Sequence, residues 1–107
     1  MLIGKKVLIS GFEPFGGSHL NSSQLVVEAI SKESLSGLEL SAVILPVEFD
    51  KAARVLLSKV NDFNPEIIIS FGQAEGRKAI TPEKIAINLD SARIPDNAGE
   101  LRVNKVI

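Results

Sequence analysis

Apolar residues in this chain form short clusters whose spacing alternates between that of strands and that of helices. Val7-Leu8-Ile9 is an apolar run without a helical period, which predicts a strand over residues 6–10 that is buried on both faces. In residues 38–45 every second position is apolar, which predicts a second strand. Ile67-Ile68-Ile69 with Phe71 predicts a third, the most apolar of the three.

Helical spacing separates these strands. The first helix is predicted to begin after Asn21, an N-cap residue, and to end near Gly37. The second is predicted from residue 50 to about residue 63, with an acidic first turn, and Asn64-Pro65 ends it. A fourth extended segment is predicted over residues 85–89, and the tail from residue 91 onward is predicted to be loop.

The order strand, helix, strand, helix, strand is typical of an α/β fold whose parallel strands are joined by right-handed crossovers. Residues 1–107 are therefore predicted to form one α/β unit. Ligands of such sheets bind beyond the carboxyl ends of the strands. The loops at those ends cover residues 11–20, 46–49 and 72–76, where we expect the site.

Composition narrows the possible chemistry. The 107 residues include 12 basic and 13 acidic ones, with no excess charge to attract nucleic acid or an anionic membrane. No apolar run approaches a membrane span and no signal peptide is visible, so we expect a cytoplasmic protein. The chain has no cysteine and a single histidine, His19, which leaves carboxylates, hydroxyls and lysines for unaided chemistry. We expect no cofactor and no metal.

The loop that follows the first strand reads Gly11-Phe12-Glu13-Pro14-Phe15-Gly16-Gly17. Its glycines permit positive φ angles and close approach of a ligand. A phosphate site at Gly16-Gly17 is one interpretation, but the chain has neither a P-loop lysine nor a Gly-x-Gly-x-x-Gly pattern. Two phenylalanines stand where a phosphate-binding loop would carry small or polar residues, so they require another explanation.

Several further strings accompany this loop in a fixed order: Leu45-Pro46-Val47, Phe71-Gly72, Gly76-Arg77, Pro82-Glu83-Lys84-Ile85-Ala86-Ile87-Asn88 and Ala92-Arg93-Ile94-Pro95-Asp96-Asn97. Together they resemble the amino-terminal half of the pyroglutamyl peptidase family, also called pyrrolidone-carboxylate peptidases. The resemblance implies a three-layer α/β/α fold with a mainly parallel sheet, of which this chain holds about half. It also implies a cysteine peptidase that removes amino-terminal pyroglutamate from peptides with a Cys-His-Glu triad.

By position in this pattern, Glu83 matches the triad glutamate, whose role is to orient the histidine. The triad cysteine and histidine belong to the other half, and His19 does not lie in the family's histidine motif. Phe12 and Phe15 match aromatics that sandwich the pyroglutamyl ring, although both could simply pack the loop against the first helix. Arg93 resembles an arginine near the oxyanion, with an ion pair to Glu83 or Glu13 as the alternative.

Three other residues have two interpretations each. Asn21 could bind substrate, cap the first helix, or do both. The backbone at Gly72 and Gln73 could hold the lactam or a developing oxyanion, or form an ordinary turn. Glu13 is expected to tie its loop to a backbone amide rather than to act as an acid.

Without the cysteine and histidine, the isolated chain is predicted to be inactive. The alternative function is a non-catalytic pyroglutamate-binding module or a complementing fragment. Three or four strands covered by two helices leave a sheet edge exposed, so we expect self-association or dependence on a complementing carboxyl-terminal fragment.

Overall fold

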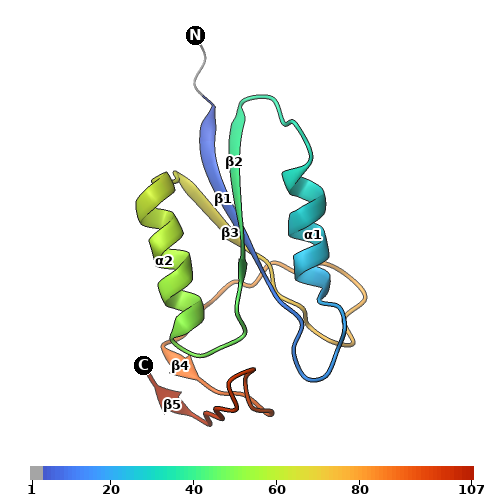
Figure 1. The fold of residues 1–107 in the computed structure, drawn as a ribbon, viewed down its shortest axis with the longest axis vertical. Coiled ribbons are helices and arrows are strands. Elements are labelled where there is room, and N and C mark those ends of the chain that lie inside the picture. The colour runs from blue at the N-terminus through green and yellow to red at the C-terminus, as the bar shows by residue number, and fades with distance from the viewer. Residues whose placement is uncertain (1–3) are drawn as a thin grey trace.

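The structure is a computed structural model that describes residues 4–107. Three parallel strands form a sheet in the order β2-β1-β3, and two helices connect them in sequence (Figure 1). This confirms the predicted α/β fold with a parallel sheet. The elements of this part are β1 (Lys5–Phe12), α1 (Ser22–Ser31), β2 (Leu38–Leu45), α2 (Lys51–Phe63) and β3 (Ile67–Ser70).

The central strand β1 carries the core. Val7, Leu8 and Ile9 are 4%, 0% and 2% exposed, as expected for a strand covered on both faces. Val7 and Ile9 pack against Val27 of α1. Because successive side chains alternate between faces, Leu8 points to the opposite face, and Figure 1 shows α1 and α2 on either side of the sheet.

Strand β3 has no helical cover within the described residues. Its three isoleucines, Ile67, Ile68 and Ile69, are 42%, 46% and 44% exposed. Helices α1 and α2 both contact β1 and β2, but neither contacts β3. The sheet therefore ends, among residues 4–107, in an exposed apolar edge strand, which is a surface that favours pairing with another strand.

Helix α1 ends at Ser31, so the predicted end near Gly37 is wrong. The Ser31 hydroxyl donates to the Glu28 carbonyl at 2.8 Å, and this local bond competes with continuation of the helix. Gly37 has φ of 77° and serves instead in the turn that leads into β2. Its carbonyl accepts from the Lys5 amide at 2.8 Å.

The carboxyl-terminal part corrects two further predictions. Residues 85–88 are not a strand, and Ile85 and Ile87 are 73% and 67% exposed, because no neighbouring strand offers them ladder hydrogen bonds in this part of the chain. The strand in this region is the short β4 (Leu89–Asp90). It pairs antiparallel with β5 (Lys105–Val106), a strand that lies within the tail predicted to be loop. Neither helix described in residues 4–107 is long and apolar enough to cross a bilayer.

Candidate functional site

A cavity of about 360 Å³ lies at the carboxyl ends of β1 and β2. Three segments line it: the loop after β1, the turn from β2 into α2, and the stretch that follows β4. This is the edge of the sheet at which the sequence predicts the site. The lining residues are Phe12, Phe15, Val47, Glu48, Phe49, Asp50, Ala52, Ala53, Asp90, Ala92, Ile94, Pro95 and Asp96.

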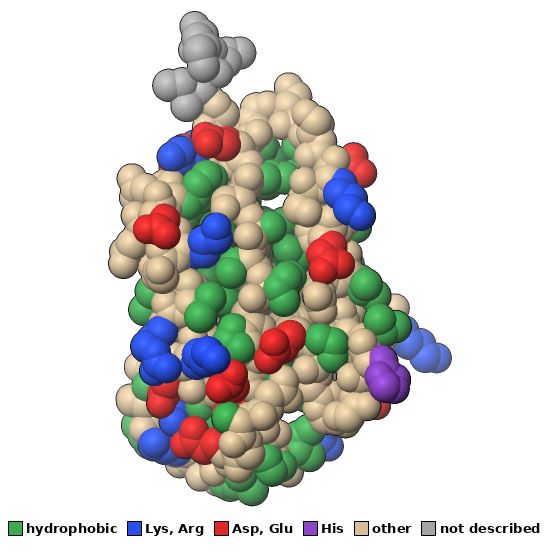
Figure 2. Space-filling model, viewed as in Figure 1, with side chains coloured by type: hydrophobic (Ala, Val, Ile, Leu, Met, Phe, Trp, Pro, Cys, Tyr) green, Lys and Arg blue, Asp and Glu red, His purple; other side chains and the backbone are tan. Residues whose placement is uncertain are grey.

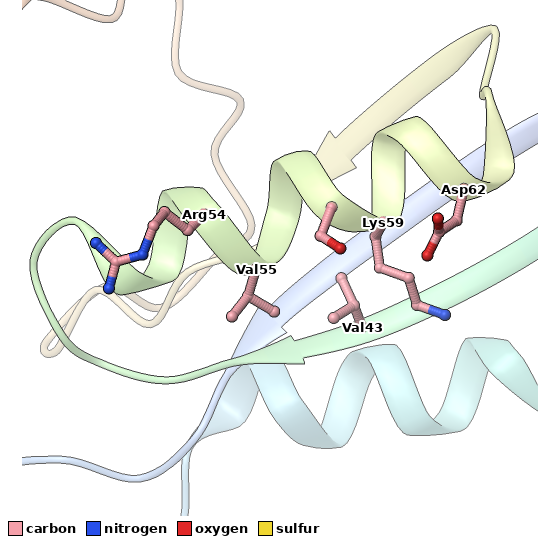
Figure 3. Close-up of a pocket in the computed structure, with 6 residues that line it drawn as sticks. Val43, Arg54, Val55, Lys59 and Asp62 are labelled. Atoms are coloured by element: carbon pink, nitrogen blue, oxygen red, sulfur yellow. The ribbon is translucent and has the colours of Figure 1, made fainter.

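A second depression lies between β2 and α2 (Figure 3). Val43 and Val55 approach each other there, and Arg54, Lys59 and Asp62 extend along the helix. None of the residues predicted for the site lines it. Figure 2 shows acidic and basic side chains interspersed over the visible face, so this face offers no single-sign field for a polyanion.

Both phenylalanines of the glycine-rich loop are half-buried and line the cavity. Gly16 and Gly17, which follow Phe15, have φ of 62° and 78°, and this left-handed backbone turns the loop back toward α1. Val47 and Ile94 also line the cavity. The result is an apolar space between aromatic rings and aliphatic side chains.

Glu13 joins this loop to two other segments. Its Oε1 atom accepts from the Val47 amide at 3.2 Å and from Asn97 Nδ2 at 3.1 Å. The same Asn97 amide group donates to the Pro14 carbonyl at 2.9 Å. The prediction that Glu13 ties its loop to a backbone amide is confirmed.

Asn21 caps helix α1. It is 1% exposed, and its Oδ1 atom accepts from the Ser23 amide at 2.9 Å and from the Ser23 hydroxyl at 2.6 Å. Its Nδ2 atom donates to the Glu13 carbonyl at 3.2 Å, which fixes the start of the loop. The predicted cap is confirmed, and Asn21 does not line the cavity.

Gln73 also stabilises the first turn of α1, because its Oε1 atom accepts a hydrogen bond from the Ser22 amide at 2.8 Å. Gly72 is exposed in the turn after β3. Neither residue lines the cavity. The structure thus brings them to the same edge of the sheet as Phe12 and Phe15, around the amino terminus of α1.

Glu83 lies away from the cavity lining, on the loop before β4. Its side chain is 73% exposed and its Oε1 atom accepts from Arg77 Nη1 at 2.8 Å. Arg93 is exposed between Ala92 and Ile94, which both line the cavity. In residues 4–107 Arg93 forms no ion pair with Glu83 or Glu13, so that alternative is wrong here.

Arg102 is a residue that the sequence interpretation missed. Its side chain is 7% exposed and donates to three carboxylates, those of Asp50, Asp90 and Glu100. Its hydrogen bonds hold the pKa of Asp50 below the ordinary value of 3.8, and the three carboxylates raise the pKa of Arg102 above its usual range. Helix α2 begins at Lys51, after Asp50, and has no acidic residue in its first turn, so the predicted acidic first turn is wrong.

Asp96 forms a comparable link through backbone amides. Its Oδ2 atom accepts from the Phe49 amide at 2.8 Å, and its Oδ1 atom accepts from the amides of Ala98 and Glu100 at 2.9 and 2.8 Å. These N–H groups, Phe49 first among them, hold the pKa of Asp96 below the ordinary value of 3.8. Asp96 and Arg102 together connect the carboxyl-terminal segment to the turn before α2.

Both lowered pKa values predict acid sensitivity. A carboxylate whose pKa is lower in the folded chain than in the unfolded chain stabilises the fold at any pH above its unfolded-state pKa. This stabilisation is lost as the pH falls from the unfolded-state pKa toward the folded-state pKa. We therefore expect the melting temperature to hold above pH 5 and to fall as pH drops below 3.8. Thermal melts between about pH 7 and pH 2.5 measure this.

The variant Asp96→Asn separates this effect from general acid denaturation. It should melt lower than wild type at neutral pH, and its melting temperature should fall less on acidification. Asp62→Asn, on the exposed face of α2, is the matched control and should follow the wild-type curve. Parallel acid curves for Asp96→Asn and wild type would contradict the assignment.

Comparison with known proteins identifies what this arrangement resembles. A family profile described as pyroglutamyl peptidase matches residues 5–107. The pyrrolidone-carboxylate peptidase of Bacillus licheniformis is 46% identical over 95 residues, covering 89% of this chain and 44% of the relative. That of Streptococcus suis is 42% identical over 102 residues, covering 95% of this chain and 47% of the relative.

Solved structures of the same family also match this chain. Pyroglutamyl peptidase I of Bacillus amyloliquefaciens superposes with a TM-score of 0.89 at 42% identity, covering 95% of this chain and 50% of that one. Pyrrolidone carboxyl peptidase of Fervidobacterium islandicum gives a TM-score of 0.91 at 37% identity, covering 95% and 49%. The chain therefore spans about half the length of the relatives it matches.

Proposed function

Since the chain belongs to the pyroglutamyl peptidase family, we propose that it forms the lactam-binding half of a cysteine peptidase that removes amino-terminal pyroglutamate from peptides. The cavity that Phe12 and Phe15 line supports this proposal. A pyroglutamyl ring is small, flat and neutral, so it gains affinity by stacking on aromatic faces without a charged partner. A volume of about 360 Å³ is sufficient for a small ligand.

In this proposal the catalytic contribution of the chain is Glu83, which orients a histidine supplied by the other half. Among residues 4–107, Arg77 is the partner of the Glu83 carboxylate, and such an exposed ion pair is worth about 0–1 kcal/mol. Little free energy is therefore lost if Glu83 releases Arg77 and binds the imidazole of the triad histidine. Arg93 is proposed to stabilise the developing oxyanion from its place beside Ala92 and Ile94.

The remaining predicted residues divide into one that is proposed to bind substrate and two that are proposed to support the binding loop. Gly72 is exposed, and its backbone groups can hydrogen-bond the lactam or the peptide. Asn21 and Gln73 are already occupied at the start of α1, so we propose that they act by holding the loop that carries Phe12. The whole enzyme is proposed to be cytoplasmic, as the family resemblance implies.

The chain alone is proposed to bind without cleaving, as a lactam-binding fragment. It contains no cysteine, and removal of the nucleophile eliminates covalent catalysis. The exposed β3 strand supports a partner that is either a complementing carboxyl-terminal half or a second copy of the chain.

Titration of the full chain with pyroglutamyl-alanine, followed by NMR, tests the proposal. We expect saturable shifts at Phe12, Phe15 and Val47 with a Kd of about 1 mM, as suits half a site. Phe15→Leu should weaken binding about 2–10-fold through lost stacking. Phe63→Leu, at the end of α2 and outside the cavity lining, is the matched control and should bind as wild type does.

Prolyl-alanine, which lacks the lactam carbonyl, should cause smaller shifts at the same concentration. A pyroglutamyl chromogenic amide should remain uncleaved by the chain alone. Absence of saturable shifts with pyroglutamyl-alanine would overturn the binding proposal, and cleavage that survives Glu83→Gln would overturn the catalytic one.

A further inference from the structure

Arg102 lies directly behind one wall of the cavity. Its Nη1 and Nη2 atoms donate to the two carboxylate oxygens of Asp50 at 3.1 and 2.7 Å. Nη1 also donates to Asp90 at 2.6 Å, and Nε donates to Glu100 at 2.9 Å. The guanidinium carbon lies 4.7 Å from the centre of the Phe49 ring, within the range of a cation–π contact.

Three of these partners belong to the cavity itself. Phe49, Asp50 and Asp90 line it, whereas Arg102 does not. Phe49 and Asp50 come from the turn before α2, and Asp90 comes from β4. The Arg102 guanidinium therefore connects two segments of the chain that line the cavity. The position of the Phe49 ring thus depends on a residue that a ligand would never touch.

The turn that carries Phe49 has local backbone bonds, from the Lys51 amide to the Phe49 carbonyl at 2.7 Å and from the Ala52 amide to the Glu48 carbonyl at 3.1 Å, but its side chains are held by the carboxyl-terminal segment. Asp50 has φ of 63°, a conformation that costs free energy in a residue other than glycine, and no side-chain cap bond compensates it. The carboxylate of Asp50 is held by Arg102, and the amide of Phe49 is held by Asp96 at 2.8 Å. The carboxyl-terminal segment therefore imposes the conformation of the turn.

We propose that Arg102 is a positioning residue for the ligand cavity. It fixes the Phe49 ring and the turn at residues 47–50 in the cavity that Phe12 and Phe15 also line. This inference rests on the proposed function for the identity of the ligand. The placement of Phe49 by Arg102 can be tested without any ligand.

The chemistry requires an arginine. Three carboxylates converge on a single cation, and only a planar fork with separate Nε, Nη1 and Nη2 donors can bond all of them in fixed directions. A lysine would keep the charge but lose the two-point bond to Asp50 and the flat contact with Phe49. Arg102→Lys should consequently release the turn while leaving the net charge unchanged.

The test compares Arg102→Lys with Arg54→Lys, a matched change at an exposed position of α2. Aromatic NMR spectra resolve the five phenylalanines of the chain. Phe63, whose ring lies 5.0 Å from Lys6 Nζ, is the internal reference. We expect Arg102→Lys to shift the Phe49 ring signals and leave those of Phe63 unchanged, and Arg54→Lys to change neither.

The same variants are titrated with pyroglutamyl-alanine. Arg102→Lys should raise the Kd about tenfold relative to wild type, and Arg54→Lys should leave it unchanged. If Arg102→Lys does not fold, Glu100→Ala replaces it, because Glu100 is 47% exposed and its truncation removes one of the four hydrogen bonds that the guanidinium donates. That variant should shift Phe49 in the same direction by a smaller amount.

The outcomes are separable from those of the proposed function. If wild type does not bind the dipeptide but Phe49 shifts in Arg102→Lys, the lactam proposal fails and the positioning of Phe49 stands. Unchanged Phe49 signals in a folded Arg102→Lys variant would overturn the positioning role. An unchanged Kd in that variant, with wild type binding normally, would overturn the link to the ligand.

Discussion

Hydrolysis of a pyroglutamyl chromogenic amide should be undetectable with the chain alone and should appear when the carboxyl-terminal half of the Bacillus licheniformis relative is added as a separate polypeptide. The triad cysteine and histidine, which the family resemblance assigns to the other half, would then meet Glu83 across a completed site. Enzymes commonly accelerate reactions by about 10⁶-fold or more over the uncatalysed rate, so restored catalysis stands far above the background. Continuous absorbance assays of each half and of the mixture measure it.

The physical reason for association lies in β3. Its outer edge is unpaired in the described chain, and Ile67, Ile68 and Ile69 are each more than 40% exposed. A parallel strand added beside β3 would satisfy the free backbone groups, and helices that follow it would bury the isoleucines on both faces. Burial of apolar area contributes about 25 cal/mol per Å², which favours this association.

Substitutions at Ile68 and Glu83 test, respectively, where the two halves associate and whether Glu83 takes part in catalysis. Ile68→Lys should prevent restoration by placing a charge in the predicted interface, whereas Leu57→Lys, at a residue of α2 that is 59% exposed, should permit it. Glu83→Gln should allow association but reduce the rate about 10³–10⁴-fold, as loss of an orienting carboxylate does in other triads. Restoration that is insensitive to Ile68→Lys would show that the halves meet elsewhere.

The features predicted correctly from the sequence are those that depend on near neighbours. β1, β2, β3 and the main part of both helices follow from the spacing of apolar residues. Asn21 was recognisable as a cap because its partner, Ser23, lies two positions away. Phe12 and Phe15, which the sequence marks as unusual between loop glycines, line the cavity, and their contact with a pyroglutamyl ring stays a prediction.

The features that were missed or predicted wrongly depend on partners distant in sequence. The bond between Arg102 and Asp50 joins residues 52 positions apart, and the pattern of residues in neither segment predicts it. Similarly, β4 exists only because Leu89 and Asp90 meet Val106 and Lys105, whereas the alternating pattern at Ile85 and Ile87 has no strand beside it among residues 4–107. Periodicity indicates which residues could form a strand, but pairing decides which of them do.

Gly11→Ala should be the most destabilising single substitution in the glycine-rich loop. A Cβ atom at this position would lie 2.6 Å from the Ser23 carbonyl oxygen and 2.9 Å from its carbonyl carbon. Both atoms belong to the backbone of α1, so no side-chain rotation can relieve the clash. Forcing extra atoms into a packed site costs about 1–3 kcal/mol, and we expect a loss at the upper end of this range.

The expected consequence reaches the cavity, because the hydroxyl of Ser23 accepts from the Phe12 amide at 2.9 Å. Movement of α1 away from Gly11 would lengthen that bond and displace Phe12, so Gly11→Ala should weaken dipeptide binding as well as lower the melting temperature. Gly72→Ala is the matched control for stability, since its added Cβ would have no heavy atom within 4 Å in the described chain apart from its own residue and the two adjacent ones. Chemical denaturation of both variants measures the difference, and values that agree within about 0.5 kcal/mol would show that β1 and α1 are not packed as closely as the structure places them.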